Sequence, residues 1–277
     1  MLVTGYCWGN GMKDSIAIIG AGVIGGAVVK SLLKSGYEGK ITVSEIQQEK
    51  ARELEQLGVT LTSDNRKAAR KADVVFLCVK PNVLKTVLKE ISKEVEEKLV
   101  ISTAAAVTIN FCKRVVPKAH FVRIMPNVAI LVQESFTAYS CDDDVTNEDK
   151  EKVKEILGVM GIAMEIEEQY MDAVTAVSGS GPGYISVIIE AIVYAGLKVG
   201  LPRDLALISA AQAVLGTAKL VLETGQTPAQ IRDNVTTPGG TTIEAIYEVE
   251  GSDVRQALMR AVEAATKKSE KIRKQWE

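Results

Sequence analysis

Two glycine-rich segments combine residue types and spacing that suit anion binding. The first, Ile16–Ala27, is an apolar run that ends in Gly20-x-Gly22-x-x-Gly25 and continues with apolar residues at helical spacing. In a strand, tight turn and helix of this kind, the first glycine permits the turn, the second admits a diphosphate, and the third lets the helix pack closely. The N–H groups and the positive dipole end of the helix then form an anion site. The context favours dinucleotide binding over a purely structural turn.

The second segment, Asn234–Ile243, contains Pro238-Gly-Gly240 just before a helix expected from about 242 to 250. Adjacent glycines after a proline can turn successive N–H groups to one side, and the helix start adds further donors. Such a nest fits a carboxylate, and Thr237 and Thr242 offer hydroxyls on either side of it. The alternative is an ordinary capped helix start.

A third segment, Val177–Gly183, places three glycines and a proline inside an apolar helical run. This is a costly arrangement unless a backbone or a ligand must approach closely. A plain loop between two helices remains the alternative interpretation.

The elements that must position these segments alternate strand and helix, which predicts an α/β fold with a right-handed, doubly wound sheet. The expected strands are Ile16–Ile19, Lys40–Ser44, Val59–Thr62, Ala72–Val79, Leu99–Ser102 and Phe121–Asn127. Two more, Ser135–Ser140 and Gly161–Ile166, flank a helix at about 146–159. We therefore predict a Rossmann-like domain over residues 12–167, preceded by a tail, 1–11, without a role in the fold.

From about Glu168 to residue 277 the pattern is all helical, and Leu205–Leu222 is apolar nearly all round. Such a helix must be covered on all sides. We expect a second copy of the chain to cover it, giving a homodimer or higher oligomer; burial within one chain is the alternative. The apolar runs approach membrane-spanning length but contain Glu190, Lys198 and Lys219, so we interpret them as buried helices of a protein without a membrane span.

Composition excludes several classes of function. The formal net charge of −2 implies no general attraction to nucleic acid or anionic membranes. The four cysteines are scattered without a CxxC pair, which argues against zinc or a disulfide framework and for the reducing cytoplasm. His120 is the single histidine and is interpreted as structural, so we expect no metal site.

Polar and small residues follow several strands at the carboxyl edge, where open α/β sheets bind ligands. Glu45, 20 residues after Gly25, can accept hydrogen bonds from ribose hydroxyls and would favour NAD over NADP, or it is a plain helix-start carboxylate. Lys80, before Pro81, either lies over the cofactor or is a solvated loop lysine. Thr103–Ala106 leaves room for a flat ring.

With these residues assembled, the chain resembles pyrroline-5-carboxylate reductases over nearly all of residues 14–275. The glycine loop carries part of the resemblance. The other matching motifs are Ser63-Asp-Asn65, Val79-Lys-Pro81, Arg123-x-Met-Pro-Asn127, Ala176-Val-Ser-Gly-Ser-Gly-Pro182, Gly200-Leu201 and, most specifically, Asp233-Asn-Val-x-x-Pro-Gly-Gly-x-Thr-Ile243.

The resemblance implies hydride transfer from NADH or NADPH to the C=N carbon of Δ1-pyrroline-5-carboxylate, giving L-proline in a site shared between subunits. It implies that Thr242 hydrogen-bonds the ring nitrogen as the catalytic residue. The implied substrate-binding residues are Asn127, Ser178, Thr237, Gly239, Gly240 and Thr241. The implied cofactor-binding residues are Gly20, Gly22, Val23, Ile24, Gly25, Ser44, Glu45, Asn65, Val79, Lys80, Pro81, Ala104 and Ala105.

The chain also departs from the family pattern. Many members have Asn-Arg, suited to the extra phosphate of NADP, where this chain has Glu45-Ile46, which favours NADH. Lys50 and Arg52 lie one helical turn further and remain within reach of a phosphate. Ala106 replaces a common glycine, and Val128 a usual threonine.

Two other classes fit less well. A β-hydroxyacid dehydrogenase would need a lysine after the second glycine-rich motif, and none occurs between Lys154 and Lys198. A nucleotide sensor without catalysis would not need the intact Thr237–Thr242 loop.

Overall fold

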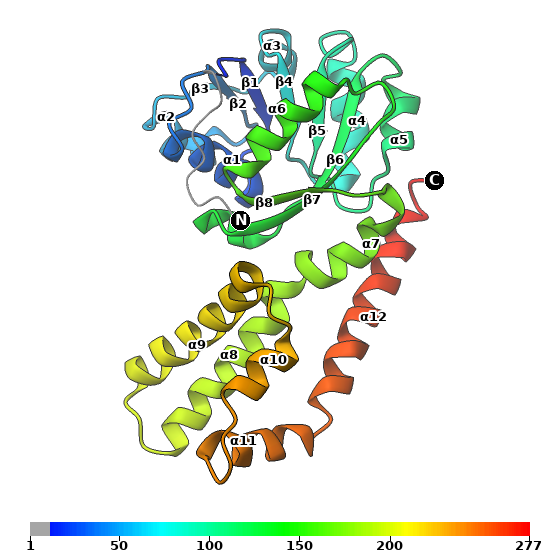
Figure 1. Ribbon diagram of the computed structural model, residues 1–277. Helices are drawn as coiled ribbons and strands as arrows, with labels where there is room; N and C mark the ends of the chain where they lie inside the picture. The colour runs from blue at the N-terminus through cyan, green and yellow to red at the C-terminus, as the bar shows by residue number, and fades with distance from the viewer. Residues whose placement is uncertain (1–11) are drawn as a thin grey trace. The chain divides into compact units, whose positions relative to one another are not determined.

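The computed structural model describes residues 12–277, which form two compact units (Figure 1). The first unit contains the chain through Ser180 and the C-terminal segment Ala265–Glu277, and the second contains Gly181–Ala264. The first unit therefore extends beyond the predicted end at residue 167. The tail predicted over residues 1–11 lies outside the described residues.

The first unit is built on a sheet that has eight strands within the described residues, in the order β3-β2-β1-β4-β5-β6-β7-β8. Neighbouring strands are parallel except β6 and β7, which are antiparallel. This order confirms the predicted doubly wound topology, whose direction of winding changes between β1 and β4. The strands are β1 (Ile16–Ile19), β2 (Ile41–Ser44), β3 (Thr60–Thr62), β4 (Val74–Leu77), β5 (Leu99–Ser102), β6 (His120–Met125), β7 (Ser135–Cys141) and β8 (Gly161–Glu165).

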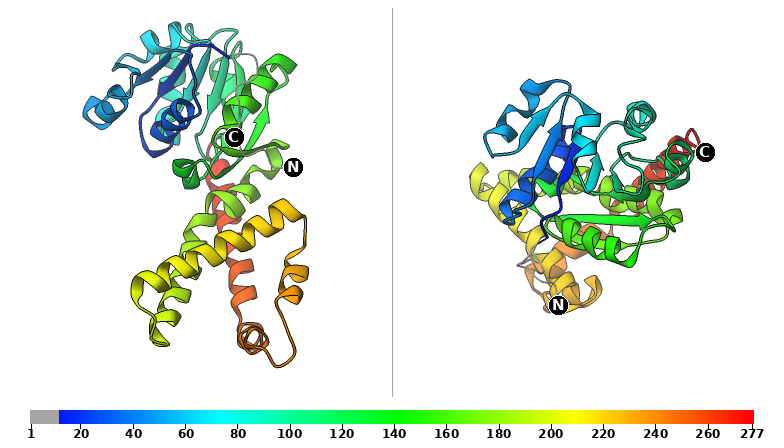
Figure 2. Two further views of the ribbon diagram at one scale, coloured as in Figure 1. Left: turned by 60° about the vertical axis from the view of Figure 1, so that its left-hand side comes forward. Right: turned by 90° about the horizontal axis from the view of Figure 1, so that it is seen from above.

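The core of this unit covers both faces of the sheet, as the continuous apolar strands predict. In β1, Ile16 and Ile18 join one core cluster, and Ala17 and Ile19 join the other. Helices cover each face (Figure 2). The first cluster contains side chains from α1 (Val23–Lys34), from α2 (Arg52–Glu55) with the preceding turn η2 (Gln48–Ala51), and from α6 (Asn147–Gly158). The second contains side chains from α3 (Asn65–Arg70), α4 (Pro81–Ile91) and α5 (Ile109–Val115).

The stretch that follows β8 is helical and belongs to the first unit. It contains η4 (Glu168–Tyr170), α7 (Met171–Val174) and a π-helical turn, η5 (Thr175–Gly179), in which the Ser180 N–H donates to the Thr175 carbonyl at 2.8 Å. The glycine-rich segment predicted to interrupt the helix thus continues it with a widened turn, and it is not a loop between two helices.

Long-range polar contacts attach this helical stretch and the C-terminal segment to the first unit. The Arg123 guanidinium donates to Glu168 at 2.9 Å. The buried Asp172 carboxylate accepts hydrogen bonds from the Ser269 hydroxyl at 2.6 Å and from Arg273 Nε at 2.7 Å. These contacts explain why the unit includes residues beyond 167.

The second unit consists of helices with little core of their own. They are α8 (Gly181–Lys198), α9 (Arg203–Thr224), α10 (Pro228–Asn234), α11 (Thr241–Glu250) and the first part of α12 (Val254–Arg273). Helices α8 and α9 approach closely at Gly196, where an added Cβ would lie 3.0 Å from the Cβ of Ala206. The buried cluster there contains Val193, Ala206 and Ala210.

Helix α9 leaves most of its apolar surface exposed in the single chain, for example 68% of Ile208 and 54% of Leu205. The alternative that one chain buries this helix is therefore wrong. By length and composition alone, the helical runs Glu168–Lys198 and Arg203–Thr224 are also apolar enough to cross a membrane, although each is interrupted by charged residues.

Candidate active site

The three glycines of the loop between β1 and α1 have different surroundings. Gly20 has φ +97°, and an added Cβ would lie 2.6 Å from the Cys78 carbonyl oxygen. At Gly25 an added Cβ would lie 2.0 Å from the Gly20 carbonyl oxygen. At Gly22 nothing lies within 4 Å of such an atom. Two glycines are thus required by the fold, and Gly22 leaves open space in front of the backbone.

The start of α1 is arranged as an anion site. Gly22 occupies the N-cap position, and no side chain caps the helix. The first-turn N–H groups and the helix dipole therefore face the open space at Gly22. Val23 is 64% exposed, while the neighbouring Ile24 packs partly against the core. The loop fits the diphosphate of a dinucleotide, because both the space and the donors are present.

The Glu45 carboxylate lies beside this loop, at the carboxyl end of β2. It accepts hydrogen bonds from the Ala21 N–H at 2.9 Å and from the Gln47 N–H at 3.0 Å. The structure thus brings Glu45 to the glycine loop. Arg52 lines a hollow of about 600 Å³ together with Ile46.

Two other predicted cofactor residues are largely buried and bonded within the protein. The Ser44 hydroxyl donates to Asn65 Oδ1 at 2.7 Å, and Asn65 Nδ2 donates to Glu90 at 2.8 Å. These contacts fix the carboxyl end of β2 against α3 and α4. They leave little of either side chain for direct ligand contact.

The remaining predicted cofactor residues follow β4 and β5. Lys80 is exposed at the N-cap of α4, between the half-buried Val79 and Pro81. Ala104 is buried and Ala105 is exposed. Ala106, at a position where the family commonly has glycine, has φ +62°, a left-handed conformation that glycine adopts at lower cost.

The structure brings together Asn127 and Ser178, the two substrate residues predicted in the first unit. Asn127 Nδ2 donates to the Ser178 carbonyl at 3.2 Å and to its hydroxyl at 3.1 Å. Asn127 follows β6, and Ser178 lies in the π-helical turn. Residues of two distant motifs thus meet at the carboxyl end of a central strand.

The other predicted substrate residues form a single loop in the second unit. The Gly240 N–H donates to the Thr237 carbonyl at 3.0 Å, and Gly239 has φ +69°, as the third position of a type II turn requires. An added Cβ on Gly240 would lie 2.4 Å from Thr237 Oγ1. The loop therefore needs glycine at both positions.

Helix α11 starts directly after this turn, with Gly240 as an N-cap that offers no side chain. By contrast, the preceding helix α10 has a complete capping box formed by Thr227 and Gln230. The sequence left two interpretations for the start of α11, an anion-binding nest or an ordinary capped helix start. Since a side chain caps α10 but none caps α11, the second interpretation does not describe α11. The half-buried Thr242 lies in the uncapped first turn, next to free space at Gly239.

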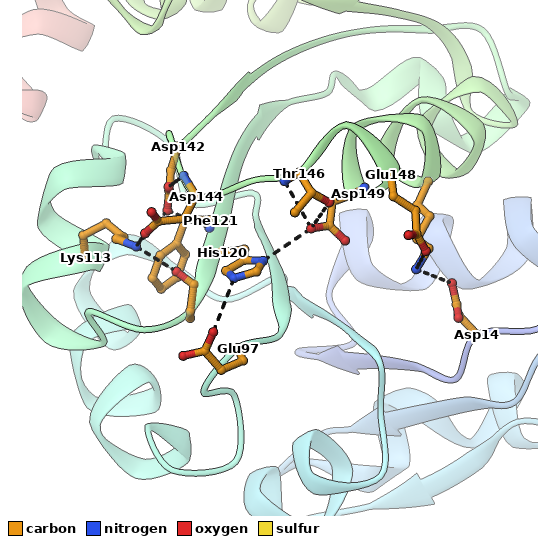
Figure 3. Close-up of polar contacts among 12 residues, drawn as sticks. Asp14, Glu97, Lys113, His120, Phe121, Asp142, Asp144, Thr146, Glu148 and Asp149 are labelled. Atoms are coloured by element: carbon orange, nitrogen blue, oxygen red, sulfur yellow. Dashed lines mark hydrogen bonds and ion pairs between the residues drawn. The ribbon is translucent and has the colours of Figure 1, made fainter.

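Side chains outside these segments offer no competing chemistry among residues 12–277. His120 begins β6, at the amino edge of the sheet, and is held by Asp149 at 3.3 Å and by Glu97 at 3.9 Å (Figure 3). Burial raises the pKa of the Cys78 thiol to about 12, so it is not a thiolate nucleophile. Within that range no three potential metal ligands converge.

A cavity of about 980 Å³ near the ends of β7 and β8 is lined by acidic residues, but it contains none of the predicted site residues. Three of its carboxylates are held in ion pairs: Asp142 and Asp144 with Lys113 (Figure 3), and Glu168 with Arg123. Sequence reasoning missed this paired cluster, since the partners are 29 or more residues apart.

The strand order of a dinucleotide-binding domain, with a glycine loop at its switch point and a separate helical unit, is characteristic of nicotinamide-dependent oxidoreductases. A family profile described as "Pyrroline-5-carboxylate reductase dimerisation" matches residues 168–272. A second, described as "NADP oxidoreductase coenzyme F420-dependent", matches residues 15–106.

Known relatives are similar over almost the whole chain. The pyrroline-5-carboxylate reductase of Methanosarcina acetivorans is 38% identical over 95% of this chain and 99% of its own. The human pyrroline-5-carboxylate reductase 2 is 37% identical over 91% and 81%.

Two solved structures that are similar to this chain belong to the same kind of enzyme. The Coxiella burnetii pyrroline-5-carboxylate reductase has a TM-score of 0.88 at 34% identity, covering 94% of this chain and 98% of its own. The Plasmodium falciparum enzyme, with NADP bound, has a TM-score of 0.86 at 30% identity, covering 95% and 100%. The chain therefore belongs to the pyrroline-5-carboxylate reductase family.

Proposed function

We propose that this chain reduces Δ1-pyrroline-5-carboxylate to L-proline with NADH as its preferred reductant, using the Thr237–Thr242 loop to bind the substrate. The reaction, with a pyridine nucleotide as hydride donor, is that of the family to which the chain belongs. The preference for NADH and the roles of individual residues are specific to this proposal.

The uncapped start of α11 is the observation that carries the assignment of the substrate loop. Three glycine and threonine backbone positions, Gly239, Gly240 and Thr241, lead into a helix start with no capping side chain. A carboxylate bound there completes the helix start and interacts favourably with its dipole. The Thr237 hydroxyl, which contacts Gly240, forms one side of this cradle.

The chemistry requires positioning more than acid or base groups. The bound reduced nicotinamide supplies the hydride, and a protonated imine is already electrophilic. The Thr242 hydroxyl therefore orients and polarises the ring nitrogen and need not act as a strong acid. Holding the carboxylate at one end and the nitrogen at the other fixes the C=N carbon for attack.

The preference for NADH rests on Glu45. Its carboxylate is held at the glycine loop by the Ala21 N–H, where it can accept hydrogen bonds from the adenosine ribose. A 2′-phosphate at that position would be repelled by the carboxylate. Arg52 lines the adjacent hollow and is a cation toward which such a phosphate would turn.

We further propose a homodimer in which the exposed faces of α8 and α9 are covered by a second copy. The dimerisation profile covers both helices, and their exposed apolar side chains need a partner. In this proposal the protein is cytoplasmic and binds neither a membrane nor nucleic acid, and the catalytic site combines segments of two subunits.

The test compares the wild-type protein with Thr242→Ala and Thr242→Ser, each with pyrroline-5-carboxylate and either NADH or NADPH. We expect turnover by the wild type with kcat/KM at least about tenfold higher for NADH. Loss of the Thr242 hydroxyl should lower kcat/KM by about 10- to 100-fold, because it removes one polar contact to the reacting ring. Thr242→Ser should stay within a few fold of the wild type.

The dissociation constant for NADH, measured by fluorescence, is the control and should change less than twofold in both variants. Equal losses in NADH affinity and kcat/KM would place Thr242 elsewhere in the molecule. A clear preference for NADPH would remove the role assigned to Glu45, and no turnover with either cofactor would refute the activity.

A further inference from the structure

Two motifs of the chain pack directly on one another at the end of the first unit. Met125 and Asn127 close β6, while Ser178 and Gly179 lie in the π-helical turn 51 residues further on. An added Cβ on Gly179 would lie 2.7 Å from Met125 Cε, so glycine permits this close packing. Next to that contact, Asn127 Nδ2 donates to the carbonyl and to the hydroxyl of Ser178, at 3.2 and 3.1 Å.

Every polar group of Asn127 has a partner, through these bonds and three others, one of which is from the Ile130 N–H to the Asn127 carbonyl at 3.1 Å. Its Oδ1 accepts from the Ala129 N–H at 2.9 Å, which caps the short helix η3 (Val128–Val132). Its own N–H donates to the buried Ser135 hydroxyl at 3.0 Å. The side-chain nitrogen of Asn127 is thus engaged within the protein, by two acceptors of Ser178.

The bond to the Ser178 carbonyl compensates for a missing backbone donor. In a regular α-helix that carbonyl would accept from the N–H four residues later, but that residue is Pro182, which has none. The chain there adopts a π-helical turn closed by Ser180 and Thr175. π-Helical turns of this type are rare and often mark functional positions.

The position of this turn in the chain gives it a functional consequence. The first unit ends at Ser180, and α8 of the second unit begins at Gly181. The Thr237–Thr242 loop belongs to the second unit, whereas the glycine loop belongs to the first. Within the first unit, the turn contacts Asn127 at the carboxyl edge of the sheet, the edge that also carries the glycine loop, so its conformation bears on the edge at which the cofactor is expected.

We propose that Asn127 is a positioning residue for hydride transfer: it acts through Ser178 to fix the π-helical turn from which α8 starts, and it does not bind the substrate. This role of Asn127 rests on the proposed function in one respect, the assignment of the substrate to the Thr237–Thr242 loop. Misalignment of the reacting atoms by about 1 Å is enough to lower a rate about 100-fold.

The decisive variant is Asn127→Asp. Aspartate keeps the acceptor that caps η3, but it has no hydrogen to donate to the Ser178 carbonyl and repels that oxygen. Asn127→Ala removes both functions. Asn110→Asp, the same chemical change at an exposed position in α5, is the matched control.

With saturating substrate and NADH, we expect both Asn127 variants to lower kcat by about 10- to 100-fold, while the control keeps the wild-type value. The dissociation constant for NADH should change less than twofold. Amide hydrogen exchange should rise in residues 175–183 and stay unchanged in residues 20–25, because only the π-helical turn has lost its support.

Three results would overturn the inference. Wild-type kcat in Asn127→Asp would show that only the cap of η3 matters. A raised KM for pyrroline-5-carboxylate at unchanged kcat would make Asn127 a substrate ligand, and parallel losses of NADH affinity and kcat would indicate general structural damage. The exchange measurement needs no turnover, so it separates failure of this inference from failure of the proposed reaction.

Discussion

The two units of the molecule differ most in how they bury apolar surface. The first unit buries both faces of its sheet, with Phe76 on β4 and Phe121 on β6 almost fully enclosed. The second encloses little more than Val193, Ala206 and Ala210. The first unit is therefore stabilised by its own core, whereas the second leaves most of its apolar side chains exposed in the single chain.

The units also share one feature, since each presents a helix start without a capping side chain. Gly22 at α1 and Gly240 at α11 are the two N-caps in question. Capping boxes complete two other helix starts, at Thr146 and Thr227, whereas α4 and α9 begin at Lys80 and Pro202 without a side-chain cap. What distinguishes Gly22 and Gly240 is that an uncapped start follows a glycine-rich loop, where a diphosphate and a carboxylate are expected to bind.

The largest expected effect is on the core of the first unit. Phe76→Ala removes a fully buried ring from a central strand and should lower the free energy of unfolding by about 3–5 kcal/mol. Leu57→Ala, at a side chain 49% exposed in the same unit, should cost less than about 0.5 kcal/mol. Urea unfolding at one fixed protein concentration measures both, and similar losses would contradict a self-sufficient core.

The second expected effect tests whether the second unit needs a partner. Ile208→Asp places a carboxylate on the exposed face of α9, where the single chain tolerates it. In a dimer that covers this face, the unpaired charge should weaken association at least about tenfold, or about 1.4 kcal/mol. Sedimentation velocity over a dilution series measures this. Leu57→Asp is the matched control, and equal behaviour of the two variants would argue against α9 as the interface.

Much of the first unit was predictable because its signals are local. Leu99–Ser102 is an apolar run bounded by polar residues, and it forms β5 with those limits. The three glycines of the loop have the separate roles that their spacing indicates, since Gly20 and Gly25 are crowded and Gly22 is open. Local periodicity and turn chemistry are sufficient for such elements.

The parts that sequence reasoning missed depend on partners far apart in the chain. Asp172 is bonded to Ser269 and Arg273, about 100 residues away, and this contact returns the C-terminal segment to the first unit. The predicted boundary at residue 167 was drawn from local sequence patterns, which do not contain such long-range contacts. The glycine and proline cluster near residue 180 predicted an interruption of the helix. The local sequence does not reveal that Asn127, 51 residues earlier, donates to the Ser178 carbonyl in place of the N–H that Pro182 lacks.

The smallest expected effect compares one carboxylate from each unit. In the first unit, Asp73 accepts two hydrogen bonds from Ser15, from its hydroxyl at 2.7 Å and its N–H at 2.8 Å, and these hold the pKa of Asp73 below its usual value. In the second, a hydrogen bond from Arg255 likewise lowers the pKa of Glu250. Both carboxylates are exposed, but Glu250 depends on an ion pair that solvent and salt screen, whereas the donors of Ser15 are neutral.

Because the pKa of Asp73 is lower in the folded state, the unfolded chain binds more protons near pH 4, and the stabilisation present at neutral pH is lost as the pH falls through the folded-state value. Asp73→Asn should therefore lower stability by about 0.5–1 kcal/mol at pH 7, with the difference from wild type shrinking toward pH 3. Glu250→Gln should change stability less, and less still in high salt. Urea unfolding of both variants between pH 7 and pH 3 measures the contrast. A larger loss from Glu250→Gln would mean that the second unit holds its own charges in place, and that its dependence on outside surface is smaller than its exposed helices indicate.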